Sequence, residues 1–384
     1  MEDDRSRLLL ALFAVVFLTS TGYGTVTFLT PVYAEELGAS YVALGVMGSL
    51  GSAVYTVMTL VSGILLDRFE RIRFYLVSLI VGVFIVSLFC ITTSLSQVIL
   101  LRGLLGIVSA AFWVASSTLT VDISPKETLS RSVGRFNQAW IVGFIVGPVV
   151  GGYIADTYGF HLLFAVLAIL LVSSVVITLR VLVPNLRLRH QNKAEGFDLS
   201  LLKCLAYAYL TLLPFAVVLG IYMAIIPGHM SAQGISGSVI GMFLTMTNAV
   251  RGIGFFNAER SVRWGTTRSL MAAAAITCTA MVLMAFSESA LSFFLPLVLY
   301  GTAAGIVTPV LLDYIANSAP QKALGTAMGV HEGVYGVGMS FGSIVGGYLA
   351  DAYGPAVLYL LLAVIAAFMI PFSVKLDDDV VREE

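Results

Sequence analysis

Charged residues are scarce in this sequence. Only 11% of its 384 residues are Asp, Glu, Lys or Arg, whereas about a quarter of a typical soluble domain is charged. Hydrophobic residues make up 58% of the chain. This balance excludes an ordinary soluble domain, so the sequence predicts a protein that resides in a lipid bilayer.

Cysteines and enzyme motifs are also sparse. The three cysteines, Cys90, Cys204 and Cys278, are widely spaced beside or inside apolar runs and form no CxxC pattern. We interpret them as buried structural thiols, with neither a disulfide framework nor a metal site. Nucleotide-binding loops, the HExxH pattern and a nucleophile elbow are missing. We therefore expect no enzyme, no bound cofactor and no metal.

Long apolar runs, by contrast, fill the chain. A spanning helix needs about 20 mostly apolar residues, and twelve runs have this length. The first run is longer than a signal-peptide core and lacks a cleavage pattern, so we expect it to stay as a span. The sequence predicts an all-α membrane protein with six helices in residues 1–183, a linker at 184–200 and six helices in residues 201–384. The runs are 8–31, 41–66, 72–93, 97–121, 132–155, 161–183, 201–227, 235–257, 268–286, 290–316, 324–350 and 356–374.

The positions of the basic residues predict the orientation. Lys and Arg concentrate at both termini, in the predicted linker and in alternate loops, and the opposite loops contain none. Since Lys and Arg accumulate in cytoplasmic loops close to spans, both termini and the linker are predicted to be cytoplasmic. A cell membrane is the expected location.

The two halves of the sequence repeat each other. The segment that begins at Gly134 matches the segment that begins at Gly329, an offset of 329 − 134 = 195 residues, and the same offset relates Asp156 to Asp351. Two six-helix bundles in the same orientation imply a pseudo-twofold axis along the membrane normal and a central cavity near the midplane.

A first motif lies between the second and third predicted helices. The segment Gly63-Ile-Leu-Leu-Asp67-Arg68-Phe-Glu70-Arg71 resembles the G-x3-D-R-x-G-R-R signature of the major facilitator superfamily, although Glu70 replaces the usual glycine. The resemblance covers essentially the whole chain and implies the major facilitator fold. It also implies that Asp67, Arg68 and Arg71 form a gate latch, the alternative being that the arginines only anchor the loop at the cytoplasmic surface.

A second motif lies in the fifth predicted helix. Gly143-Phe-Ile-Val-Gly147-Pro148-Val-Val-Gly151-Gly152 is similar to the G-x3-G-P-x2-G-G element of the family's antiporters. Small residues let this helix approach a neighbour closely, and Pro148 removes one backbone hydrogen bond, so we expect a hinge. Tight static packing is the alternative, because the repeat keeps the glycines but has Ser343 in place of proline.

A third motif, Arg102-Gly-Leu-Leu-Gly106, is similar to the family's R-x3-G element, which is linked to proton coupling in its exporters. Arg102 lies near the end of its predicted helix, so snorkelling to the interface is the alternative. The first helix lacks the carboxylate that drug exporters of the family often carry.

The second half carries further charges inside its predicted spans: Arg251, Asp313, His331 and Glu332. Arg251 and Glu332 are predicted at similar depth, about 10 Å from the helix ends. An acid beside a histidine and an arginine is suited to a proton or ion switch. The alternative is a permanent structural salt bridge between Arg251 and Glu332 or Asp313.

Polar and aromatic side chains in the spans are the candidates for substrate contact. By the repeat, Glu332 corresponds to Asn137, which Gln138 follows. A Trp or Tyr in a span is equally explained by packing or by anchoring at the interface. The candidates are Tyr23, Trp113, Asn137, Gln138, Trp140, Asn248 and Arg251.

Taken with these residues, the resemblance implies a secondary transporter that works by alternating access. The leading hypothesis is a proton-coupled exporter of amphiphilic or drug-like compounds. A symporter or uniporter for a small polar or anionic metabolite is the first alternative, and a non-transporting sensor or lipid-handling protein on the same fold is the second. We expect a monomer whose partners are a small molecule, protons and the bilayer, with no nucleic acid.

Overall fold

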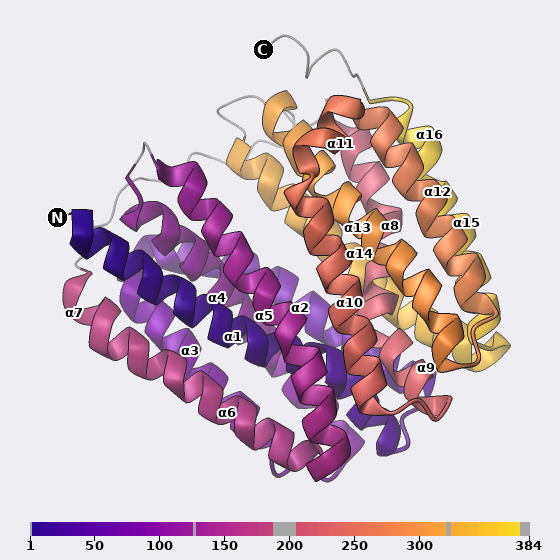
Figure 1. Cartoon of the computed structure of the whole chain (residues 1–384), viewed down its shortest axis with the longest axis horizontal. Coiled ribbons are helices and arrows are strands. Elements are labelled where there is room, and N and C mark those ends of the chain that lie inside the picture. Colours follow the sequence, from indigo (N-terminus) through magenta and orange to yellow (C-terminus); the bar gives the residue numbers. More distant parts are fainter. Residues whose placement is uncertain (1, 126–127, 187–204, 320–323, 377–384) are drawn as a thin grey trace. The chain divides into compact units, whose positions relative to one another are not determined.

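The computed structural model describes residues 2–125, 128–186, 205–319 and 324–376, and these residues form helices and no strand (Figure 1). The predicted linker at 184–200 lies mostly outside the described residues. The helices are α1 Glu2–Glu36, α2 Tyr41–Arg68, α3 Arg71–Phe89, α4 Leu95–Ile123, α5 Leu129–Tyr158, α6 Phe160–Ile177 with the π-helical turn Thr178–Leu182, α7 Val183–Asn185, α8 Ala206–Ala224, α9 Ile226–Ala232, α10 Gly237–Phe256, α11 Ala258–Trp264, α12 Thr266–Ala285, α13 Ala290–Ser318, α14 Leu324–Tyr353, α15 Pro355–Ala367 and α16 Met369–Ser373.

The lengths and hydropathy of these helices confirm a multi-pass membrane protein. In the described residues, 11 helices are long and apolar enough to cross a bilayer. The predicted span at 324–350 lies in α14, which has the required length of 30 residues. Its many glycines and the polar pair His331 and Glu332 lower its hydropathy, so α14 is not among the 11. The two sets of six helices that the sequence predicts are therefore present.

The helices divide into two compact units. Unit 1 comprises Met1–Gly38, Ala53–Ala194 and Ser236–Thr245. In this unit α1 packs against α4, α5 and α6, and α3 packs against α4 and α6. Its core contains large, fully buried rings, among them Tyr75, Phe89, Phe112 and Phe164.

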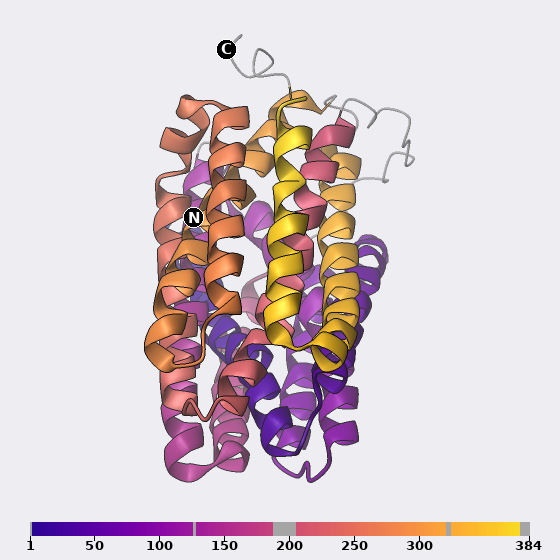
Figure 2. The same cartoon turned by 90° about the vertical axis from the view of Figure 1, so that its right-hand side faces the viewer.

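Unit 2 comprises Ala39–Ser52, Glu195–Ile235 and Met246–Glu384. Here α8 packs against α14, and α12 packs against α13 and α15. Figure 2 shows the orange and yellow helices of this unit running nearly side by side as a bundle. Phe215, Phe293, Tyr300 and Tyr359 are the largest side chains of its fully buried core.

Two helices are shared between the units. The first residues of α2, up to Ser52, belong to unit 2, and the first residues of α10, up to Thr245, belong to unit 1. Each follows the same local pattern, a glycine with positive φ and then a serine two residues later: Gly38 and Ser40 before α2, Gly234 and Ser236 before α10. The glycine ends the preceding helix because it alone adopts this backbone conformation without strain.

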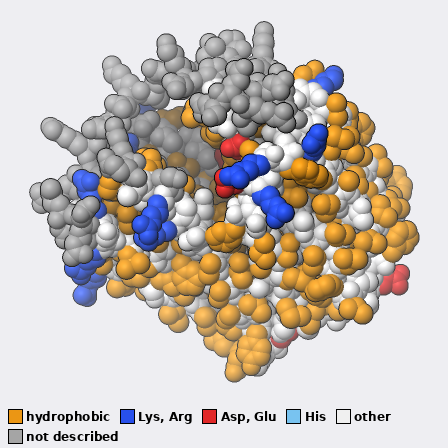
Figure 3. Space-filling model, turned by 45° about the horizontal axis from the view of Figure 1, so that its top comes forward, with side chains coloured by type: hydrophobic (Ala, Val, Ile, Leu, Met, Phe, Trp, Pro, Cys, Tyr) orange, Lys and Arg blue, Asp and Glu red, His pale blue; other side chains and the backbone are white. Residues whose placement is uncertain are grey.

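The outside of the helices is suited to lipid. On the face shown in Figure 3, hydrophobic side chains cover most of the surface, and Lys and Arg side chains gather toward one end. Exposed apolar residues occur in the middle of spans, for example Ile169 on α6 and Val364 on α15. Such residues are stable at the surface when the surrounding medium is hydrocarbon.

Candidate functional site

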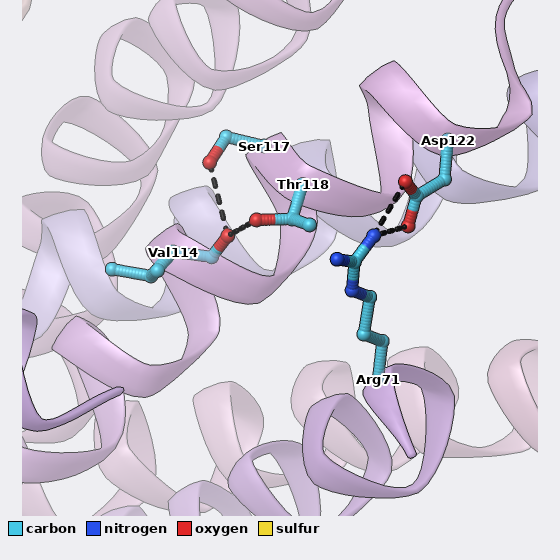
Figure 4. Close-up of polar contacts among 5 residues, drawn as sticks. All are labelled: Arg71, Val114, Ser117, Thr118 and Asp122. Carbon is cyan, nitrogen blue, oxygen red and sulfur yellow. Dashed lines mark hydrogen bonds and ion pairs between the residues drawn. The ribbon is translucent and has the colours of Figure 1, made fainter. Parts of the chain in front are cut away.

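The sequence-predicted latch contains an ion pair between two helix ends of unit 1. Arg71 begins α3, and its Nη1 atom donates to both carboxylate oxygens of Asp122 near the end of α4, at 2.6 and 2.7 Å (Figure 4). Both side chains are less than one-fifth exposed. Because charged hydrogen bonds in partly buried sites are strong, this pair holds the ends of α3 and α4 together.

The other latch residues are arranged differently. Arg73 pairs with Glu70 at 2.6 Å, so the residue that replaces the usual glycine forms a surface ion pair. Arg68 is exposed at the end of α2. The backbone of Asp67 lies in α2, whereas its side chain is outside the described residues.

The glycines of the predicted hinge place α5 directly against α1. A Cβ atom on Gly143 would lie 2.7 Å from Ser20 Cβ and 2.8 Å from the carbonyl oxygen of Phe17. Gly147 and Gly151 approach Thr21, Thr25 and Leu29 in the same way. These positions therefore require glycine, and α5 continues through Pro148 as one helix.

At its far end, α5 packs against the start of α10 within unit 1. A Cβ on Gly152 would meet the backbone of Gly237, and a Cβ on Gly241 would meet the carbonyl of Pro148. Asp156 then accepts hydrogen bonds from the backbone amides of Gly237, at 2.8 Å, and Ser238, at 2.7 Å. The carboxylate thus caps the positive end of α10.

Unit 2 contains the counterpart of this capping contact, and we call the two contacts the aspartate clasps. Asp351, at the end of α14, accepts hydrogen bonds from the backbone amides of Tyr41 and Val42 at the start of α2, both at 2.9 Å. Gly347 packs against the backbone of Tyr41 there. The repeat offset of 195 residues therefore relates two aspartates that each cap the first turn of a helix.

An aromatic cluster lies between α4 and α5 in unit 1. The Trp113 ring contacts Phe136, Trp140 and Phe144, with ring centroids 6.3 to 6.4 Å apart, and Trp140 contacts Phe144 at 5.7 Å. The Trp140 indole donates to Asn137 Oδ1 at 3.0 Å. Both tryptophans are only partly buried, so part of each ring is open to a ligand.

Two polar side chains, Asn137 and Gln138, follow Phe136 on α5, and Asn137 lies beside the cluster. Asn137 and Gln138 are exposed although they lie more than two turns inside the helix. Exposed amides at this depth need contact with water, because hydrocarbon offers them no hydrogen bond. Tyr23, by contrast, is only 2% exposed, and its ring meets Phe112 edge-on.

Arg102 is partly buried in α4. Within the described part of the chain no hydrogen bond or ion pair is formed by its guanidinium. The sequence-based role of Arg102 in proton coupling stays a prediction.

Arg251 lies among tyrosines in unit 2. Its guanidinium carbon lies 5.2 Å from the centre of the Phe255 ring on the same helix. The hydroxyls of Tyr222 on α8, Tyr300 on α13 and Tyr335 on α14 lie in the surroundings of this charge. Gly305 of α13 packs directly against the backbone of Arg251 and so positions this part of α10. The close packing of α13 on α10 therefore helps to bring these side chains together.

The acids predicted to pair with Arg251 do not do so here. Glu332 Oε1 lies 3.3 Å from His331 Nδ1, and half of the Glu332 side chain is exposed. Asp313 is partly buried on α13 and lies near Asn317 of its own helix. Among the described residues, neither acid forms an ion pair with Arg251, so a permanent salt bridge is not the arrangement in this structure. Asn248, the remaining candidate on α10, is 7% exposed.

Several site residues were not predicted from the sequence. Asp122, Phe136 and Phe144 complete interactions of predicted residues, and three tyrosines surround Arg251 as described. The only signal for the two clasps was the repeat, which relates Asp156 to Asp351 but does not indicate what either residue binds.

Comparisons with known proteins agree with this architecture. The family model described as Major Facilitator Superfamily matches residues 12–213 and again residues 208–383. Multidrug resistance protein 1 of Bacillus subtilis is 24% identical over 91% of this chain and 91% of its own length. Multidrug resistance protein MdtG of Enterobacter lignolyticus is 24% identical over 92% of this chain and 88% of its length. An uncharacterized MFS-type transporter of Methanocaldococcus jannaschii is also 24% identical, over 92% and 94%.

Solved structures share the fold. A POT family transporter in complex with 5-aminolevulinic acid superimposes with a TM-score of 0.80 at 12% identity, covering 97% of this chain and 96% of that one. The nucleoside transporter NupG superimposes with a TM-score of 0.77 at 15% identity, covering 96% and 99%. At these identities the likeness concerns the fold alone.

Proposed function

Because this chain belongs to the Major Facilitator Superfamily, we propose that it is a proton-coupled exporter of amphiphilic, drug-like compounds that works by alternating access. It is a multi-pass membrane transporter of small molecules and not an enzyme. The further proposal places it in the cell membrane as a monomer, with both termini in the cytoplasm because of its basic loops.

The observation that carries this proposal is the aromatic cluster of Trp113, Phe136, Trp140 and Phe144. Ring faces attract organic cations, and ring surfaces bind apolar bodies without demanding a fixed hydrogen-bond pattern. The exposed amide of Asn137, which accepts a hydrogen bond from the Trp140 indole, borders the cluster, and Gln138 is the next residue along α5. Together they are suited to a ligand with one apolar and one polar end. The multidrug names of two relatives support the same substrate class.

Alternation is proposed to use the packing of α5. Gly143, Gly147 and Gly151 form the contact with α1, while Pro148 and Gly152 border α10. Pro148 leaves one carbonyl of α5 without its helical hydrogen bond, which lowers the cost of bending there. Asp67, Arg68 and Arg71 are the proposed latch at the other end of the helices, with Asp122 as the partner of Arg71.

Proton coupling is proposed to use Glu332, with His331, Asp313 and Arg102 as further candidates. Glu332 is an exposed acid within a long helix, next to a buried histidine. A carboxylate in such a position changes its charge when water reaches it from one side and then from the other.

The test is proton flux in sealed proteoliposomes that contain the purified protein. The internal pH is followed while hydrophobic cations and small organic anions are added in turn. The exporter predicts proton movement with the cations. Movement with anions alone would favour the symporter, for which Arg251 and Arg102 are the supporting residues. An unchanged internal pH with every compound would contradict proton-coupled export of these substrates.

Tryptophan variants link the flux to the aromatic cluster. Trp113→Ala and Trp140→Ala are each expected to raise the half-saturating concentration of the cation about tenfold, because each removes a ring contact and apolar area. Trp264→Ala is the matched control, since Trp264 is exposed on α11 outside the spans. Equal effects of all three substitutions would remove the cluster from the binding site.

A further inference from the structure

The neighbourhood of Arg251 in unit 2 contains buried polar groups whose hydrogen bonds the described residues leave unmade. The Nε atom of Arg251 and the hydroxyl of Tyr300 are buried and have no hydrogen-bond partner among the described residues. A guanidinium has five N–H donors and no acceptor. Tyr300 and Tyr335 add hydroxyls within electrostatic range of this charge.

No carboxylate among the described residues balances the charge of Arg251. Glu332 lies beside His331 and is half exposed, and Asp313 lies near Asn317. In the described ranges, no acid lies within 4 Å of the guanidinium. The Phe255 ring at 5.2 Å contributes a cation–π contact. An unpaired charge inside a membrane-spanning bundle is unfavourable, and the ring compensates for only part of this cost.

The surroundings are fixed rather than adaptable. Gly301 packs against the backbone of Thr247, and Gly305 packs against the backbone of Arg251, so α10 lies directly on α13. Tyr300 is 1% exposed and stacks with Phe215. The hydroxyl of Tyr335 bonds to Thr308 at 3.0 Å. These contacts keep the donors in place and prevent the tyrosines from turning away.

We propose that Arg251, together with the hydroxyl of Tyr300, binds a small monovalent anion in unit 2, either an inorganic anion or the carboxylate of an organic molecule. The anion accepts hydrogen bonds from the Arg251 guanidinium and from Tyr300, and it supplies the negative charge that the described side chains do not. This assignment goes beyond drug export and does not depend on it, because binding is measured without transport.

The experiment measures the thermal stability of the purified full-length chain in detergent. Sodium chloride or sodium benzoate replaces part of a sodium HEPES buffer at constant ionic strength, so only the size and type of the anion change. The site predicts a saturable rise in the unfolding temperature, because a ligand that binds only the folded state stabilises it. Stabilisation by both anions identifies a site open to inorganic anions, whereas stabilisation by benzoate alone identifies a site for organic carboxylates.

Variants assign the effect to the site. Arg251→Gln is expected to abolish the saturable rise, and Tyr300→Phe, which removes one hydroxyl, is expected to raise the half-saturating concentration about tenfold. Arg260→Gln is the control, since Arg260 is exposed on α11, and it should titrate like the wild type. If Arg251→Gln does not fold, the titration of Tyr300→Phe alone decides whether the proposed anion site exists.

Two results would overturn the proposal. One is a wild-type protein without a saturable response to either anion, or an unchanged response in Tyr300→Phe. The other is a response that appears only in Glu332→Gln, which would mean that Glu332 itself neutralises Arg251 in solution. Since no proton gradient is used, failure here leaves the exporter proposal intact, and failure of the flux assay leaves this site intact.

Discussion

Glu332 is the carboxylate that the proposed coupling depends on. It lies on α14 between turns of small residues, it is half exposed, and it contacts the imidazole of His331. The imidazole ring in turn lies 5.1 Å from the Tyr335 ring. A change in the charge of Glu332 therefore reaches the same group of side chains that surrounds Arg251.

The first prediction concerns this carboxylate. Glu332→Gln keeps the shape of the side chain but cannot release a proton, so transport driven by a proton gradient should be abolished while exchange of labelled substrate persists. Both activities are measured in the same proteoliposomes. Glu288→Gln, an exposed acid between α12 and α13, is the control that should retain both. Normal gradient-driven transport by Glu332→Gln would exclude Glu332 from coupling.

At the residue scale, the sequence identified single side chains better than it identified their partners. The pattern around Arg71 predicted a latch, but Asp122, which binds Arg71, is 51 residues further along the chain. Depth along a helix was predictable from 1.5 Å per residue. Rotation about the helix axis was not, and so Tyr23, predicted at the substrate, is buried against Phe112.

At the scale of elements, α5 depends on glycine where it meets α1. The second prediction is that Gly143→Val destabilises the protein by about 1 to 3 kcal/mol, because the added methyl groups would overlap Ser20 and the carbonyl of Phe17. Thermal unfolding in detergent measures this loss. Gly134→Ala on the same helix is the matched control, since nothing lies within 4 Å of the added Cβ there. It should unfold at the wild-type temperature or slightly above, because alanine favours the helix.

The two aspartate clasps are the second feature at this scale. The third prediction is that Asp156→Ala and Asp351→Ala each cost the clasped arrangement about 1 kcal/mol, the usual value for a lost helix cap. Both changes together should raise the ratio of open to clasped molecules roughly 30-fold over the wild type, because the two losses add to about 2 kcal/mol.

Spin labels measure this opening. In a cysteine-free background, labels at Ala232 and Tyr158, both exposed near the ends of α9 and α5, report the separation of the start of α10 from the end of α5. A longer distance appears in the Asp156→Ala variant if the clasp holds these ends together. Asp156→Asn is the control, because asparagine also caps helices and should keep the short distance. An unchanged distance in both variants would show that glycine packing alone closes this end.

The repeat explains why these element contacts were only half predictable. An offset of 195 residues placed Asp156 and Asp351 at equivalent positions, and both are followed by a glycine with φ of +85°, Gly159 and Gly354. Their partners are 81 and 310 residues distant in sequence. Local patterns fix where a helix begins and ends, whereas contacts over such separations depend on how the bundles assemble.

At the scale of the whole molecule, each half of the sequence supplies part of the other half's unit. Residues Ala39–Ser52 of α2 belong to unit 2, and residues Ser236–Thr245 of α10 belong to unit 1. The sequence predicted two bundles with a linker at 184–200 between them, and most of that linker lies outside the described residues. The exchange of segments was not predictable, because it depends on Gly45, Gly152 and Gly241 meeting backbone far away in the sequence.

The fourth prediction follows from this exchange. Residues 1–190 and 195–384, expressed together as separate chains, should copurify in detergent, because the caps on Tyr41 and Gly237 and the glycine contacts around them do not require the linker. Residues 1–190 alone should unfold at a lower temperature, since the first turns of α2 then lose Asp351 and Gly347.

The copurified pair should also lose its association when Gly347→Val and Gly152→Val are combined, because each valine would overlap a backbone atom of the partner helix. Gly329→Ala with Gly134→Ala, where the added Cβ meets nothing, should leave the pair intact. Halves that fold equally well alone and do not copurify would mean that the two units are independent in solution, and that the shared helices contribute little to holding the transporter together.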